Sequence, residues 1–107
     1  MWLVTTRGFY SVVCSSDDPE VVVVGTRTRS DLDSILGLLG RPRMVENGAD
    51  GAFPFHVRVP LETWARAVGA LAREIKYPTF TEAVAEKQGD ERAGAYQRAA
   101  EAFDSIE

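Results

Sequence analysis

Two strand-like runs of apolar and aromatic residues open the sequence. Residues 2–14 are rich in aromatic and β-branched side chains, which favour strands, and Gly8 in their middle indicates a bulge or a bend. Residues 15–19 have the serine, aspartate and proline content of a turn, and residues 20–29 form a second strand-like run. Because the connection is short, the two runs are expected to pair as an antiparallel hairpin.

Residues 30–39 have the spacing of a short helix. Ser30 marks its start, and two aspartates lie in its first turn, where the helix dipole favours negative charge. The apolar stripe of this helix consists of Leu32, Ile35, Leu36 and Leu39. Gly40 and Pro42 end it.

A second set of strands and a longer helix are predicted between residues 44 and 75. A short strand at 44–46 leads into an Asn-Gly turn at 47–51. Alternation with polar and proline residues then predicts a half-buried strand whose inward positions are Phe53, Phe55, Val57 and Val59. The clearest helix of the chain covers 61–75, with apolar positions at Leu61, Trp64, Val68, Leu71 and Ile75.

Two further helices are predicted in the last third of the chain. Thr79 and Glu82 have the spacing of a capping box and start a helix that runs to about Lys87. After the break at Gly89, Asp90 is expected to cap a final helix. The apolar face of that helix is thin, because it carries Tyr96, Ala99, Phe103 and Ile106 among many alanines.

These elements predict one α+β domain over residues 1–107. We expect an antiparallel sheet of about four strands in ββα-ββα order, with helices on one face. Residues 1–75 form the ββαββα unit, and residues 76–107 form a C-terminal helical pair packed on it.

Composition narrows the setting of this domain. The 107 residues are 45% hydrophobic, which suits one domain with an apolar core, and the longest apolar run is four valines at 21–24, too short for a membrane span or a signal peptide. Cys14 is the only cysteine, so a reducing, cytoplasmic location is expected. We interpret Cys14 as a small strand-end residue rather than a nucleophile.

The net charge of −4 is unevenly distributed. Residues 1–73 contain eight acidic residues and eight arginines, whereas residues 74–107 contain eight acidic and four basic residues. The negative charge therefore lies entirely in the helical end of the chain, where it would suit a basic partner surface.

The sequence contains no pattern typical of a catalytic or metal site. His56 and Cys14 are the only imidazole and thiol, and the phosphate-binding and acyl-transfer motifs are absent. His56 is expected to be an ordinary surface histidine, with general-base catalysis as the alternative. We therefore predict a protein that is not an enzyme and that needs no cofactor or metal.

A basic sheet face is the first candidate binding surface. The segment from Arg7 to Val12 is similar to the start of the base-stacking strand of RRM domains, although it lies on the first strand and lacks the second aromatic. Strand alternation gives three pairs that each share a face: Arg7 with Phe9, Arg27 with Arg29, and His56 with Arg58. If these faces coincide, the sheet presents arginines and an aromatic ring to RNA or DNA; the alternative is a merely solvated polar face.

The helical end holds the other candidate residues. Tyr77 and Phe80 flank Pro78 and are expected either to close the core or to line a ligand cleft. Arg92 and Tyr96 lie one helical turn apart, where Arg92 either joins the last two helices or binds an anionic partner.

Four segments of the chain resemble a family of short, uncharacterised bacterial proteins. They are the opening MWLVTTRGFYSVV and the segments RTRSDL, IKYPTF and AEKQGDERAGAY. The resemblance covers nearly the whole chain, which favours a free-standing small protein. It departs at Ala99 and Ala100, where the family carries bulkier apolar residues, and it implies no activity and no site residues.

The function expected from the sequence is therefore binding rather than catalysis. We predict a small, non-catalytic cytoplasmic binding or regulatory protein that acts through protein–protein contact or self-association, such as a dimer. The alternative is RNA or DNA binding through the arginine-bearing sheet face, that is, Arg7, Arg27, Arg29 and Arg58. An enzyme that uses His56 is a third hypothesis.

Overall fold

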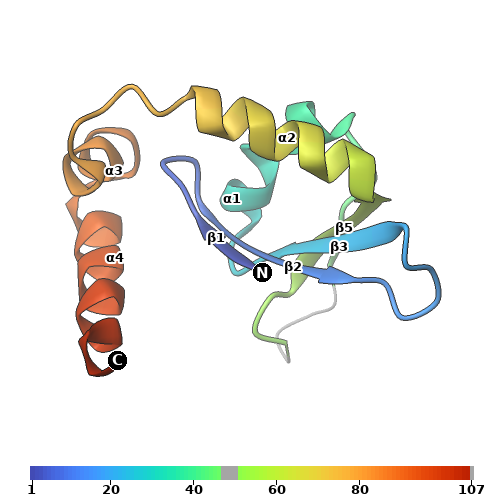
Figure 1. Ribbon diagram of the computed structural model, residues 1–107, viewed down its shortest axis with the longest axis horizontal. Coiled ribbons are helices and arrows are strands. Elements are labelled where there is room, and N and C mark those ends of the chain that lie inside the picture. Colours follow the sequence, from blue (N-terminus) through green and yellow to red (C-terminus); the bar gives the residue numbers. More distant parts are fainter. Residues whose placement is uncertain (47–50, 107) are drawn as a thin grey trace. The chain divides into compact units, whose positions relative to one another are not determined.

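The computed structural model of the chain describes residues 1–46 and 51–106. These residues fall into two compact units, Met1–Ile75 and Lys76–Glu107 (Figure 1). The turn predicted at 47–51 lies almost wholly outside the described residues. None of the described helices is long and apolar enough to cross a membrane.

The first unit is built on a five-stranded antiparallel sheet with the strand order β1-β2-β3-β5-β4. The strands are β1 (Trp2–Val4), β2 (Phe9–Cys14), β3 (Val21–Thr26), β4 (Val45–Glu46) and β5 (Phe55–Pro60). The predicted α+β class and antiparallel sheet are confirmed, with one strand more than the four expected.

The additional strand arises because residues 2–14 form a hairpin and not one bent strand. Val4 pairs with Phe9, and the Thr5 N–H donates to the Gly8 carbonyl at 2.9 Å to close the turn between β1 and β2. The Thr5 hydroxyl oxygen also accepts from the Arg7 N–H at 3.0 Å. This side-chain bonding reverses the chain at the point where the sequence indicated only a bulge, so the order is βββα-ββα.

The helix predicted over 30–39 is two shorter pieces, α1 (Arg29–Asp33) and a 3-10 turn, η1 (Leu36–Leu39). The Ser34 hydroxyl donates to the Asp31 carbonyl at 2.6 Å and the Ile35 N–H donates to the Leu32 carbonyl at 3.1 Å, which tightens the backbone between the two pieces. The helix α2 (Leu61–Arg73) ends two residues before the predicted position, and Ile75 is exposed.

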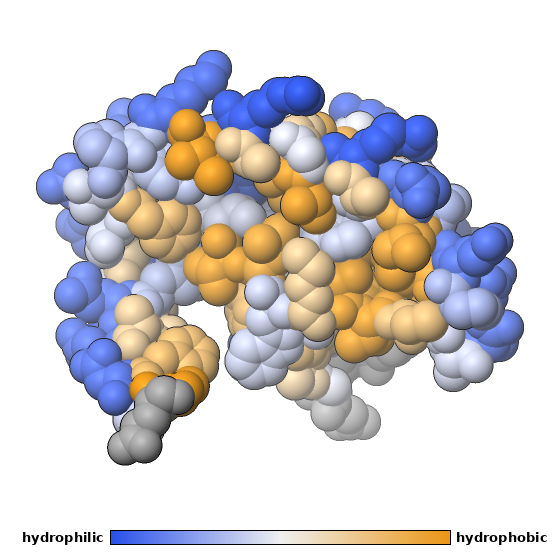
Figure 2. All heavy atoms as spheres, in the orientation of Figure 1, coloured by the Kyte–Doolittle hydropathy of each residue, from blue (hydrophilic) through white to orange (hydrophobic). Residues whose placement is uncertain are grey.

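The core of this unit lies between the sheet and its helices, which cover one side of the strands (Figure 1). From the sheet it takes Tyr10, Val12, Val22, Val24, Val57 and Val59. From the helical segments it takes Leu32, Ile35, Leu39, Trp64, Ala67 and Leu71. In the view of Figure 2, hydrophilic side chains line the outer side of α2 and hydrophobic ones gather over β1, β2 and β3.

The opposite face of the sheet carries no helix of the described part of this unit. Tyr10 and Val12 of β2 are buried against the helices, so the alternate positions Phe9, Ser11 and Val13 point to the other side. We call this other side the open face.

The second unit is a helical pair, α3 (Phe80–Gln88) and α4 (Asp90–Ala102), followed by a 3-10 turn, η2 (Phe103–Ser105). Gly89 separates the helices with a φ of +94°, a conformation that glycine adopts without strain. Thr79 occupies the predicted cap position without a side-chain cap hydrogen bond, and Asp90 is the first helical residue rather than the cap.

The core of the helical pair is small. Among its described residues only Val84 and Ala93 are buried, whereas Phe103 and Ile106 are exposed. The thin apolar face expected for the last helix is therefore present in the structure.

Candidate functional site

One row of residues crosses all five strands on the open face. Each member lies opposite the next in the antiparallel register, so their side chains share one side of the sheet. From edge to edge the row runs Trp2, Ser11, Gly25, His56 and Val45.

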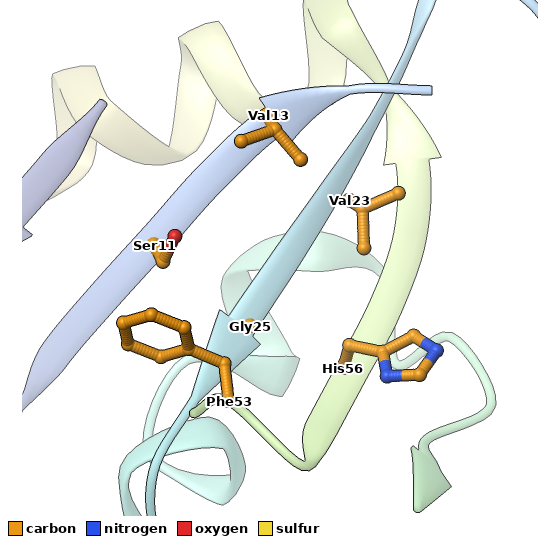
Figure 3. A pocket seen from close by; sticks show the side chains of 6 residues that line it. All are labelled: Ser11, Val13, Val23, Gly25, Phe53 and His56. Atoms are coloured by element: carbon orange, nitrogen blue, oxygen red, sulfur yellow. The ribbon is translucent and has the colours of Figure 1, made fainter. Parts of the chain in front are cut away.

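The small residues in the middle of this row leave a hollow in the open face. Ser11 and Gly25 provide little side-chain volume between the indole of Trp2 and the imidazole of His56. The hollow has a volume of about 270 Å³ and is lined by Ser11, Val13, Val23, Gly25, Phe53 and His56. Figure 3 shows these side chains in front of β2, β3 and β5, with the helices behind the strands.

Phe53 forms one wall of the hollow by packing across Gly25. It was expected at an inward strand position, but β5 begins only at Phe55, so strand alternation does not set the direction of Phe53. A Cβ atom added at Gly25 would lie 3.0 Å from the Phe53 Cβ, so the absence of a side chain at Gly25 allows this close approach. Glycine at position 25 therefore allows the Phe53 side chain to lie close to the sheet, at the edge of the hollow.

Three aromatic rings form a cluster next to the hollow. Trp2 and Phe9 have ring centroids 5.5 Å apart, and Phe9 and Phe53 have centroids 5.6 Å apart, both in edge-to-face geometry. Trp2 also approaches Phe53 at 6.3 Å. Edge-to-face contacts between aromatic rings are energetically favourable. The three rings therefore hold one another in place, although Trp2 is 67% exposed.

Valines extend the apolar surface beyond the rings. Val13 on β2 is 57% exposed, and Val4 and Val45, on the two edge strands, are also exposed. Val23 is half-buried beside Val13, its partner in the register. Exposed apolar side chains gathered on one face of a sheet are typical of a contact site for another molecule.

The charge nearest to the hollow is neutralised. The Arg58 guanidinium on β5 donates to the Ser15 hydroxyl at 2.8 Å and to the Asp17 carboxylate at 3.0 Å. The hydrogen bond from Ser15, and then that from Arg58, lower the pKa of Asp17. Asp17 therefore stays ionised at neutral pH, and the pair presents no net charge.

The predicted arginine surface is divided between several places. Arg7 lies in the β1–β2 turn, where its side chain reaches toward the helices and donates to the Glu74 carboxylate at 2.6–3.1 Å and to the Ser34 carbonyl. The hydrogen bond and charge of Glu74 raise the pKa of Arg7. Arg27 follows β3 and donates to the Ala52 carbonyl at 3.2 Å, while Arg29 is the first residue of α1.

Of the predicted surface residues on the sheet, Phe9, His56 and Arg58 share the open face, and Arg7 does not. The alternation argument placed Arg7 inside a strand, whereas the turn at 5–8 removes it from the sheet. Sequence reasoning also missed Trp2, because the same turn sets the face to which β1 points. A tight turn at residues 5–8, if it had been recognised, would have brought Trp2 opposite Ser11.

The side chains that line the hollow are mostly apolar. His56 is the only imidazole of the chain, and beside the hollow it neighbours valines, a phenyl ring and the Ser11 hydroxyl. The described residues contain no group of three or more histidine, cysteine or acidic side chains placed to hold a metal ion. The hollow suits an apolar side chain, which Ser11 and His56 can supplement with a hydrogen bond.

The four predicted residues of the helical end do come together, within the second unit. Tyr77 and Phe80 have ring centroids 5.9 Å apart, and Phe80 stacks on Tyr96 at 6.1 Å. The Arg92 guanidinium lies 5.8 Å from the Tyr96 ring centroid and donates to its hydroxyl at 3.0 Å. The stacking of Phe80 on Tyr96 connects α3 with α4, whereas the contacts between Arg92 and Tyr96 lie within α4.

Comparison with protein-family models, with curated proteins and with solved structures finds no match to this chain.

Proposed function

We propose that this protein is a small, non-catalytic cytoplasmic binding protein that acts through protein–protein contact, with the open face as its contact surface. The observation that supports this proposal is the gathering of Trp2, Phe9, Phe53 and Val13 around the hollow. Aromatic residues are enriched at protein interfaces, and an exposed apolar surface with a polar rim marks such contacts in soluble proteins.

The charges of the open face favour a protein partner over a nucleic acid. Phosphate contacts by arginine and lysine dominate nucleic-acid affinity. Arg58 is already paired with Asp17, and Arg7 is held by Glu74 on the side of the helices. A nucleic acid would therefore have to displace an existing ion pair, whereas an apolar protein surface would not.

RNA or DNA binding is a second candidate, supported by the aromatic rings themselves. Exposed rings on an antiparallel sheet are used to stack single-stranded bases. Trp2 offers an exposed ring beside the half-buried Phe9, and the exposed Arg27 lies just beyond β3. This candidate predicts binding that weakens as the salt concentration rises.

Affinity capture from the cells that express the protein tests the proposal. The bait proteins are the wild type, Val13→Glu on the open face, and Leu61→Glu as a matched control on α2. Both positions are exposed valine or leucine residues, so neither substitution removes a core side chain. We expect the wild type and Leu61→Glu to retain the same proteins and Val13→Glu to lose them.

Two results would contradict the proposal. If Val13→Glu retained every protein that the wild type retains, the open face would not be the contact surface. If nuclease treatment and 0.5 M salt removed all captured material, the nucleic-acid candidate would replace the protein-contact one.

A further inference from the structure

We infer that the outer edge of β1 binds an extended segment of another polypeptide, which adds to the sheet as a further strand. Backbone groups at the edge of the sheet carry this inference, so it goes beyond the proposed function, which depends on the side chains around the hollow. The register of β1, the composition of the two sheet edges and the incomplete cover of Leu3 support it.

The register of β1 shows which of its backbone groups are left for a partner. Met1 and Val12 exchange hydrogen bonds in both directions, at 2.8 and 3.0 Å. Because bonded and non-bonded pairs alternate in an antiparallel ladder, Leu3 also bonds to β2, whereas Trp2 and Val4 direct their N–H and C=O groups away from it. None of the turn, loop or cap hydrogen bonds of the described residues uses these four groups. An extended peptide has the backbone spacing to bond to them.

The two edges of the sheet differ in the features that oppose strand addition. At the far edge, β4 covers only two residues of β5, and the uncovered end of β5 holds Arg58 and Pro60. Charge and proline at an edge discourage pairing, and proline lacks the N–H that a new strand would need. Residues 1–4 contain neither a charged side chain nor a proline. The β1 edge is therefore the one that admits a strand.

The side chains of β1 indicate the composition of the added segment. Leu3 lies opposite Tyr10, on the helix side of the sheet, and is only half-buried against the core. Trp2 and Val4 lie on the open face and are 67% and 43% exposed. An added strand would place alternate side chains beside Leu3 on one side of the sheet and beside Trp2 and Val4 on the other. The segment that suits this edge is therefore short, uncharged and apolar on both of its faces.

NMR titration of the ¹⁵N-labelled full chain tests the inference. The probe is a synthetic peptide with a run of four valines between pairs of lysines, which keep it soluble. Because β1 is short and offers at most four hydrogen bonds, we expect the Trp2 and Val4 amide signals to shift with a dissociation constant on the order of 1 mM. Hydrogen exchange of these two amides should slow about sixfold at about 5 mM peptide. The Leu3 amide, which already bonds to β2, is the internal reference.

Substitutions at position 4 separate the backbone contact from the side chain. Val4→Pro removes an outward N–H that the ladder between β1 and β2 does not use. Val4→Ala also loses the valine side chain but keeps the N–H, so it is the matched control. We expect Val4→Pro to weaken peptide binding at least about fivefold and Val4→Ala to change it less than about twofold. Circular dichroism verifies the fold of both variants.

Three results would overturn the assignment of this edge. Trp2 and Val4 signals that do not move at the highest peptide concentration would show that the edge takes no strand. Equal weakening by Val4→Pro and Val4→Ala would assign the binding to the side chain. Protection of both amides when the chain alone is concentrated would show that a second copy occupies the edge.

Val13→Glu separates this inference from the proposed function. Val13 lies on β2 beyond the residues that pair with β1, so Val13→Glu should leave peptide binding unchanged, and a loss of binding would place the peptide on the open face instead. If Val13→Glu abolishes capture from cells while the edge binds no peptide, the proposed function stands alone. If the edge binds peptide and Val13→Glu retains every captured protein, the edge contact stands and the proposed function fails.

Discussion

The buried carboxylate of Asp31 leaves no room for a side chain at Gly8. Asp31 is only 4% exposed, and its carboxylate accepts the Phe9 N–H at 3.0 Å. A Cβ atom at Gly8 would lie 2.5 Å from the Asp31 Cγ and 2.8 Å from its Cβ. The β1–β2 turn and helix α1 are thus in close contact at this point. A methyl group at residue 8 would require either the backbone of the turn or the Asp31 carboxylate to move.

Gly8→Ala should lower the free energy of unfolding by about 2 kcal/mol or more, because it displaces a buried, hydrogen-bonded carboxylate. Gly69→Ala is the matched control. Gly69 lies in α2, and apart from the neighbouring helix backbone nothing lies within 4 Å of an added Cβ, so alanine there should raise stability by about 0.5–1 kcal/mol. Urea denaturation measures both, and equal effects of the two substitutions would contradict the packing described for Gly8.

The hydrogen bonds of Asp17 predict a pH dependence at the rim of the open face. Its pKa is lowered in the folded protein, so this interaction stabilises the fold above the unfolded pKa of about 3.9 and is lost as the pH falls through the lower, folded value. The Ser15 hydroxyl is the largest cause. Ser15→Ala should therefore raise the pKa of Asp17, measured by NMR titration of its carboxyl carbon, and a value unchanged by the substitution would contradict this geometry.

The helix α1 begins with a cap two residues earlier than the sequence indicated. The Thr28 hydroxyl accepts the Asp31 N–H at 3.2 Å, while Ser30, the predicted start, is already inside the helix. Both residues are good caps by type, and only the backbone decides which is used: Thr28 is extended, with φ −123° and ψ 149°. Residue preference alone could not distinguish them.

Thr28→Ala should reduce the free energy of unfolding by about 1 kcal/mol, the usual cost of removing a side-chain cap. Ser30→Ala, in contrast, should change it by less than about 0.5 kcal/mol, since Ser30 is exposed and does not bond the helix N-terminus. Thermal denaturation of the two variants ranks them, and a larger loss for Ser30→Ala would show that the helix starts where the sequence suggested.

Helices and strands with a strong local pattern of apolar residues could be predicted from the sequence. The hairpin, which depends on a tight turn of the chain, could not. The helix α2 was found because its apolar residues recur at three-four spacing, and β5 because Val57 and Val59 alternate with outward residues. The β1–β2 hairpin was missed because its turn depends on hydrogen bonds of Thr5. The candidate surface depended on that turn, so Phe9, His56 and Arg58 were found on the open face and Trp2 was not.

The two units of the molecule differ in how much apolar surface they bury. Twelve buried residues form the core of the unit Met1–Ile75, whereas the helical pair has Val84 and Ala93 among its described residues. The contacts of the pair include the stacking of Phe80 in α3 on Tyr96 in α4. Regions that bury less apolar surface unfold locally at a lower free-energy cost. We therefore expect the helical pair to unfold locally while the unit Met1–Ile75 stays folded.

Native-state hydrogen exchange should show this difference. We expect amides of α4 to exchange through an opening at least about 2 kcal/mol smaller than that of the central strands β2, β3 and β5. Tyr96→Ala removes the stacking and the hydrogen bond from Arg92, so it should speed exchange in α3 and α4 and leave the strands unchanged. Uniform protection across both units, or loss of strand protection in Tyr96→Ala, would contradict separate opening.

The alternation along β2 bears on how this protein can evolve. Tyr10 and Val12 hold the fold, while Ser11 and Val13, on the same strand, shape the hollow. Substitutions at Ser11, Val13 and Val23 can therefore change the lining of the hollow while the buried side chains stay constant. A lineage could therefore remodel this face by few mutations without passing through an unfolded intermediate, and a library randomised at these three positions would sample new surfaces on an intact scaffold.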